Sequence, residues 1–199
     1  LDVPERIYQG KARLMFEKRH TDLVEQGKQL QGKRAQLLSL WQEIAENFYP
    51  ERADFTTSRS LGDEFAGNLD TSYPILARRD LGNAFGAMLR PSGKEWFNNR
   101  QKREGDEDEA ARQWLEMTTR VQRRAIYDRE SGYVRATKEG DQDYASFGQN
   151  VISVELATAP NSGSVLLHRC WHLRDVWWCE DAWGRIATIY RKWKASARD

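Results

Sequence analysis

Apolar residues in the first quarter of the chain recur with the spacing of an α-helix. Four of them lie seven residues apart, namely Leu23, Leu30, Leu37 and Ile44. Other apolar positions widen this row to one helical face. Thr21 is a candidate N-cap, and Pro50 marks the end, because proline lacks the amide hydrogen that a helix needs. The pattern predicts one packed helix, since a coiled coil needs a longer repeat.

A second helical pattern begins near Asp70 or Thr71 and stops before Pro91. Gly82 and Gly86 lie inside it and lower its helix propensity. Because glycine has no side chain, we expect another segment of the protein to approach this helix closely at these two positions.

Two further helices are predicted before residue 150. One runs from Ala110 to Ile126, with acidic residues before its start and arginines late, which suits the helix dipole. The other spans residues 133–147 and ends at Gly148, a residue type that favours helix termination. The apolar stripes of the predicted helices place four aromatic residues in the core: Trp41, Phe48, Phe85 and Trp114.

The pattern changes from helical spacing to strict alternation after Gly148. Residues 151–157 and 165–173 read as two strands around a turn at 159–163, which contains proline and glycine. Residues 176–179 and 185–193 form a second predicted hairpin around Gly184. The order predicts an α+β fold, with a mainly helical region at residues 1–149 packed with a small antiparallel sheet at residues 150–199.

Composition narrows the function classes. The 199 residues are 31% charged, with 31 basic and 30 acidic residues and a net charge of +1. This balance argues against a free nucleic-acid-binding protein, which usually carries a clear basic excess. Neither a membrane-spanning stretch nor a secretory signal is recognisable, so we expect no membrane partner. Two cysteines are too few to organise the fold by disulfides.

Catalytic and metal-binding motifs find little support. His168, Cys170 and His172 alternate and could share one strand face as metal ligands, although ordinary strand residues explain them better. No nucleophile-elbow motif pairs a serine with a base, and Gly82–Gly86 lacks the residues of a phosphate-binding loop. We therefore predict no catalytic residues, no metal site, no cofactor and no enzymatic activity.

Basic residues are the remaining candidates for contacts with other molecules. Five of them could touch a neighbouring subunit or DNA: Arg120, Arg123, Arg124, Arg191 and Lys192. The alternative is a solvated or salt-bridged surface, because acidic residues lie nearby in the sequence.

Several segments, in the same order along the chain, resemble the portal or head-to-tail connecting proteins of short-tailed bacteriophages. They are residues 41–52 (WQEIAENFYPER), 70–72 (DTS), 89–97 (LRPSGKEWF), 114–115 (WL), 143–149 (DYASFGQ), 180–186 (EDAWGRI) and 190–193 (YRKW). None of these motifs has a catalytic meaning; the resemblance lies in their co-occurrence.

The resemblance implies the wing portion of a portal subunit, with the stem following Asp199. It implies a dodecameric ring at one capsid vertex, assembled in the host cytoplasm and retained in the virion. The implied partners are further copies of the chain, major capsid and scaffolding proteins, the terminase packaging motor, tail adaptor proteins and double-stranded DNA. Two alternatives stay open: another phage structural protein such as a tail adaptor, or a nucleic-acid-binding module.

Overall fold

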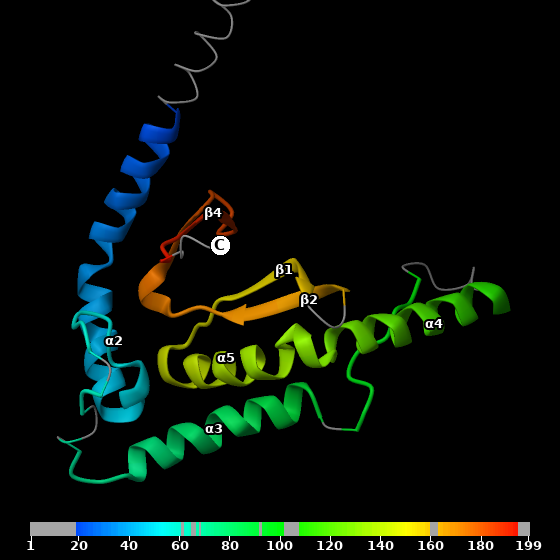
Figure 1. The fold of residues 1–199 in the computed structure, drawn as a ribbon, viewed down its shortest axis with the longest axis horizontal. Helices are drawn as coiled ribbons and strands as arrows, with labels where there is room; N and C mark the ends of the chain where they lie inside the picture. Colours follow the sequence, from blue (N-terminus) through cyan, green and yellow to red (C-terminus); the bar gives the residue numbers. More distant parts are fainter. Residues whose placement is uncertain are drawn as a thin grey trace, which may run out of the picture. The chain divides into compact units, whose positions relative to one another are not determined.

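A computed structural model describes residues 19–60, 62–64, 67, 69–91, 93–101, 108–159 and 163–194 of the chain. It contains helices followed by antiparallel hairpins, which confirms the α+β class (Figure 1). Residues 19–33 are helical. The elements that follow are α2 (Ala35–Phe48), η1 (Pro50–Arg52), α3 (Tyr73–Leu89), α4 (Glu109–Ile126), η2 (Arg129–Ser131), α5 (Tyr133–Phe147), β1 (Ile152–Ala159), β2 (Gly163–Cys170), η3 (Leu173–Asp175), β3 (Val176–Glu180) and β4 (Ile186–Arg191).

The helix predicted from Thr21 to Pro50 differs from the observed one in two ways. Residues 19 and 20 are already helical, so the prediction of Thr21 as an N-cap is wrong. A turn at Arg34 also interrupts the helical path, where the Arg34 amide bonds to the carbonyl of Gln31, three residues back. The predicted end is correct, since α2 stops just before Pro50.

The described strands form two separate two-stranded antiparallel sheets, where a single small sheet was expected. In the first, Ile152 lies opposite Cys170 and Ala159 opposite Gly163. In the second, Val176 lies opposite Arg191 and a bulge follows Cys179. Residues 160–162 of the predicted turn lie outside the described part of the chain.

Chain contacts divide the protein into two compact units, whereas the sequence-based division at residue 149 follows the change in secondary structure. Unit 1 comprises residues 1–40 and 174–199, and unit 2 comprises residues 41–173. Within unit 1, Arg34 donates a 2.6 Å hydrogen bond to the carbonyl of Val176. The hydroxyl of Tyr190 donates to Oε1 of Gln26 at 2.8 Å. The N-terminal helix and the β3–β4 hairpin are therefore held together by polar contacts.

Unit 2 is layered, with α5 between α3 and the β1–β2 hairpin (Figure 1). A Cβ at Gly82 would lie 2.4 Å from the amide nitrogen of Gln142, and one at Gly86 would lie 3.0 Å from the Asp141 carboxylate. The expectation that these glycines admit a close neighbour is confirmed, because α5 side chains fill the space that larger residues on α3 would need.

The aromatic core of unit 2 lies where α2, η1 and α5 meet. Trp41 is only 2% exposed and contacts Phe55 and Phe147 at ring-centroid distances of 5.6 and 6.0 Å. Phe85 is half-buried against Tyr144. The other two core predictions are wrong for this chain: Phe48 is 43% exposed and Trp114 is 64% exposed. Their helices pack through other faces.

Candidate functional site

Helix α4 presents an apolar face to solvent. Asp108 caps the helix by accepting a 2.6 Å hydrogen bond from the amide of Ala111. Three large apolar residues spaced like one side of a helix follow at exposures of 58–64%: Trp114, Met117 and Val121. Burying such a surface is favourable, so an exposed row of this kind is typical of a binding surface.

Two of the predicted contact residues flank this apolar face. Arg120 and Arg124 lie four residues apart on α4 and are both exposed. We call the surface formed by these two arginines and Trp114, Met117 and Val121 the α4 face. It combines apolar area with positive charge, as protein–protein interfaces often do.

Arg123 serves a different purpose. Its guanidinium lies 2.7 Å from Oε1 of Glu95 and donates a 3.1 Å hydrogen bond to the carbonyl of Lys94. Thr119, on the same side of α4, accepts a hydrogen bond from the amide of Asn99 at 3.0 Å. This side therefore holds residues 94–99 against α4, and Arg123 is engaged within the chain.

Arg191 and Lys192, the other two predicted contact residues, line a groove in unit 1 of about 600 Å³. We call it the unit 1 groove. Its remaining lining residues come from the N-terminal helix and the β3–β4 hairpin: Val24, Gly27, Lys28, Gln31, Trp177, Tyr190 and Trp193. Arg191 lies over the Trp193 ring at 4.5 Å. The structure thus divides the five predicted residues into two groups, with Arg191 and Lys192 in unit 1 and Arg120, Arg123 and Arg124 on α4 in unit 2.

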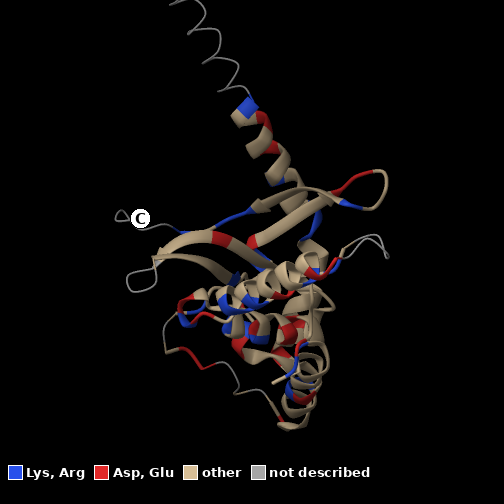
Figure 2. Ribbon diagram, turned by 90° about the vertical axis from the view of Figure 1, so that its right-hand side faces the viewer, with Lys and Arg blue, Asp and Glu red and all other residues tan. Residues whose placement is uncertain are grey.

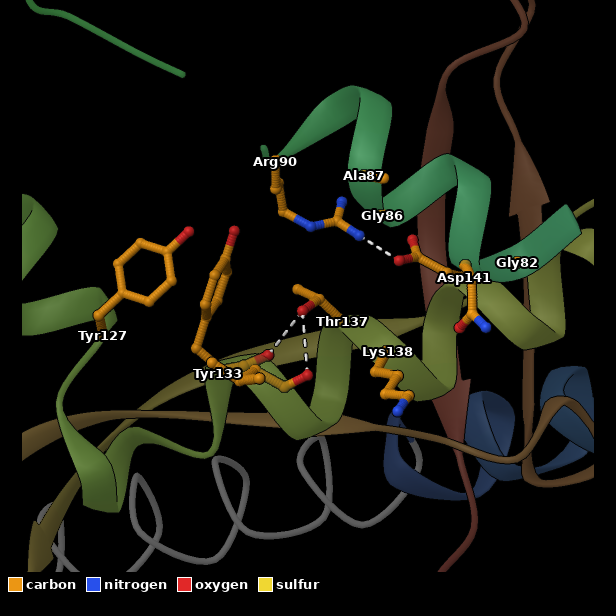
Figure 3. Close-up of a pocket in the computed structure, with 11 residues that line it drawn as sticks. Gly82, Gly86, Ala87, Arg90, Tyr127, Tyr133, Thr137, Lys138 and Asp141 are labelled. Carbon is orange, nitrogen blue, oxygen red and sulfur yellow. Dashed lines mark hydrogen bonds and ion pairs between the residues drawn. The ribbon is translucent and has the colours of Figure 1, made fainter. Parts of the chain in front are cut away.

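A second cavity, of about 340 Å³, lies between α3 and α5 (Figure 3). Arg90 at the end of α3 points toward Asp141 of α5 and forms an ion pair with it. The rings of Tyr127 and Tyr133 meet edge to face at 5.2 Å. Burial raises the pKa of Tyr133, and neighbouring Tyr127 adds to this. The Tyr133 phenol therefore stays protonated at neutral pH. The Arg90–Asp141 pair joins two helices.

A buried polar cluster links η1, α5 and β2 in unit 2. Asp143 is 1% exposed and accepts two hydrogen bonds of 3.1 Å from Arg52. The Cys170 thiol donates to the same carboxylate at 3.6 Å. Burial raises the pKa of Asp143 although Arg52 opposes the shift, and burial together with Asp143 raises the pKa of Cys170 to about 12. Such a thiol is a poor nucleophile and a poor metal ligand.

The alternating His168, Cys170 and His172 do not converge on one point. A His168 ring nitrogen lies 3.3 Å from the carbonyl of Ser131, whereas His172 lies 2.6 Å from the carboxylate of Asp54. Strand β2 ends at Cys170, so His172 is beyond the alternation. No group of three potential ligands suited to a metal ion occurs among the described residues.

Sequence reasoning missed the Arg52–Asp143 pair, because 91 residues separate its members and no local motif marks them. It also assigned no role to Trp177, whose indole nitrogen is buried without a hydrogen-bond partner among the described residues. The cluster of tryptophans after residue 170 was the available signal.

Polar clusters tie helices to strands in unit 2, and large apolar side chains remain exposed on α4. Basic and acidic residues are interspersed along the helices (Figure 2). The family of bacteriophage head to tail connecting proteins matches residues 20–199, and the chain belongs to this family. A comparison with curated proteins gives no match.

Membership of this family makes the chain a structural component of the virion that contacts capsid and tail components. None of the described helices is both long enough and apolar enough to cross a membrane.

Proposed function

We propose that the chain is the wing portion of a portal subunit, which assembles into a dodecameric ring at one vertex of the capsid. Double-stranded DNA enters and leaves through this ring. In this role the protein binds major capsid and scaffolding proteins during head assembly in the host cytoplasm. It then receives the terminase packaging motor and, later, tail adaptor proteins. The mainly helical residues 1–149 and the β-rich residues 150–199 both belong to the wing.

The α4 face is the observation that best supports assembly into a ring. Trp114, Met117 and Val121 are exposed on a well-capped helix, and arginines flank them. A neighbouring copy that covers this face removes apolar area from water, while Arg120 and Arg124 meet acidic groups that fix the register. Family membership supports the same role, because a connector works as part of a larger assembly.

Assembly of the full-length protein tests this proposal. Sedimentation velocity and negative-stain electron microscopy should show closed rings for the unmodified protein. Trp114→Ala should shift the population toward smaller species, because a large contact is lost. Met88→Ala is the control, since Met88 is 81% exposed on α3 and is not part of the α4 face. A full-length protein that remains monomeric at all concentrations would contradict the proposal.

A further inference from the structure

The unit 1 groove has a buried floor with an unused hydrogen-bond donor. Trp177 is 7% exposed and stacks on Tyr190 with ring centroids 6.2 Å apart. Its Nε1 has no hydrogen-bond partner in the described part of the chain. This nitrogen is itself buried within the chain, so the groove offers an occupant the apolar ring surface of its floor. A Cβ at Gly27 would lie 2.9 Å from the Tyr190 ring, so the helix packs tightly on the hairpin at this point.

The rim of the same groove is basic. Lys28, Arg191 and Lys192 contribute three positive charges, and no described lining residue is acidic. The rest of the lining is largely aromatic and aliphatic. The groove therefore fits an aromatic or aliphatic group that has acidic neighbours.

The β3–β4 hairpin carries such a group at its other end. Trp183 in the connecting turn is 78% exposed, and Glu180 and Asp181 precede it. The Asp181 carboxylate accepts hydrogen bonds from the amides of Trp183 and Arg185 at 2.8 and 2.9 Å. Gly184 completes the turn with a φ of 71°, which favours glycine. Arg185 lies over the Trp183 ring at 5.0 Å and pairs with the Asp181 carboxylate at 3.3 Å. The turn is thus fixed in shape and presents an exposed tryptophan close in sequence to Glu180.

We propose that the turn at residues 180–185 of one subunit inserts Trp183 into the unit 1 groove of the neighbouring subunit. Glu180 then meets the basic rim near Lys192. An inserted tryptophan buries about 150–250 Å² and is a common energetic centre of interfaces.

A second copy of the chain is favoured over DNA for two reasons. The groove is largely apolar and is lined by a helix and a hairpin, so it suits an apolar side chain better than a continuous phosphate backbone. The turn and the groove also lie at opposite ends of one hairpin, where Glu180 pairs with Ile186 and Val176 pairs with Arg191. Two different surfaces that bind head to tail generate a closed ring when the rotation between copies closes. This inference rests on the proposed ring.

Charge exchange and photo-crosslinking on the full-length protein test the contact. Trp183→Ala and Lys192→Glu should each raise the protein concentration for half-assembly at least tenfold. Combining Glu180→Lys with Lys192→Glu should restore much of the loss, because the pair is re-formed with opposite signs. Tyr73→Ala and Lys33→Glu serve as controls, since both residues are exposed and lie outside the groove and the turn. Circular dichroism should confirm that each variant is folded.

Benzoylphenylalanine in place of Trp183 should crosslink one subunit to residues 24–31 or 190–193 of another, whereas the same probe at Tyr73 should not. Normal rings from the Trp183 and Lys192 variants, or crosslinks that map elsewhere, would overturn the contact and leave the proposed ring standing. Rings that persist while DNA affinity falls in Lys192→Glu would identify a nucleic-acid site and overturn it too. A full-length protein that forms no rings would refute both the proposed function and the contact.

Discussion

At the scale of single residues, the Arg52–Asp143 pair joins parts of unit 2 that are distant in the sequence. Two parallel hydrogen bonds hold a carboxylate that is almost fully enclosed. Taking both groups out of water is costly, so a buried pair of this kind adds less to stability than its geometry suggests. Removing one partner lowers the free energy of unfolding much more than replacing both with apolar residues would, because the remaining charge stays largely buried.

We expect Asp143→Ala to lower the free energy of unfolding by about 3–5 kcal/mol, since Arg52 would then be an uncompensated buried cation. Urea denaturation followed by circular dichroism measures the change. Arg135→Ala is the control: Arg135 pairs with Glu139, but its side chain is 85% exposed. This surface pair should contribute at most about 1 kcal/mol. Equal losses in the two variants would contradict the role assigned to Asp143.

Cys170 should resist alkylation in the folded protein. Its pKa of about 12 lies well above the ordinary value of 9.0. At pH 8 the reactive thiolate is therefore about a thousandfold scarcer than for an ordinary thiol. Iodoacetamide labelling followed by peptide mass spectrometry should show very slow modification of Cys170, and rapid modification once urea unfolds the chain. Comparable rates in the two states would contradict the buried environment.

At the scale of helices and strands, the packing of α3 on α5 depends on the absence of a side chain at Gly82. Gln142 fills the space opposite it and accepts a 2.7 Å hydrogen bond from Arg78. Arg78 in turn donates to the carbonyl of Phe48 at 3.2 Å. Displacing Gln142 would therefore disturb a connection that reaches the end of α2.

Gly82→Ala should destabilise the protein by about 1–3 kcal/mol, because the added methyl overpacks this contact. Gly32 provides a matched control within residues 19–33, since nothing lies within 4 Å of a Cβ placed there. Gly32→Ala should stabilise by about 0.4–1 kcal/mol through helix propensity and a more restricted unfolded chain. Thermal unfolding of the two variants should give shifts of opposite sign, and shifts of the same sign would argue against close packing at Gly82.

Periodicity was sufficient to predict α5 and the two hairpins, because their spacing and glycines act over a few neighbouring residues. It failed at Trp114 because α4 carries two apolar sides. Leu115 and Ile126 are half-buried, whereas Trp114 is exposed. A stripe that awaits another chain has the same spacing as one that packs within its own chain. The unit 1 groove could not be predicted either, since residues about 150 positions apart form it.

At the scale of the whole molecule, the nearly equal numbers of basic and acidic residues favour a role in assembly over tight DNA binding. Each tight phosphate contact adds salt-dependent affinity, which would hold DNA in place. A net charge of +1 suits the proposed role, in which DNA slides past the protein. In the proposed ring, the exposed Arg120 and Arg124 pair with acidic groups of neighbouring subunits.

Arg124→Glu in the full-length protein should impair ring formation before it changes DNA affinity. Arg124 is exposed, so its loss should leave the free energy of unfolding within about 0.5 kcal/mol. Arg123→Glu is the informative comparison, because it breaks the contacts with Glu95 and Lys94 and should loosen residues 94–99. Sedimentation velocity and a salt titration of DNA binding measure the two effects. Normal rings with lost DNA affinity would favour the nucleic-acid-binding alternative.

The two-stranded sheets make aggregation of newly made subunits more favourable. Each described strand is paired with one other strand only, so its second edge has no strand partner among the described residues. Open edges are templates on which strands of other chains can add, and exposed Val154 and Leu156 on β1 make such addition more favourable. We therefore expect unassembled subunits to aggregate more readily than subunits that have been incorporated into a particle.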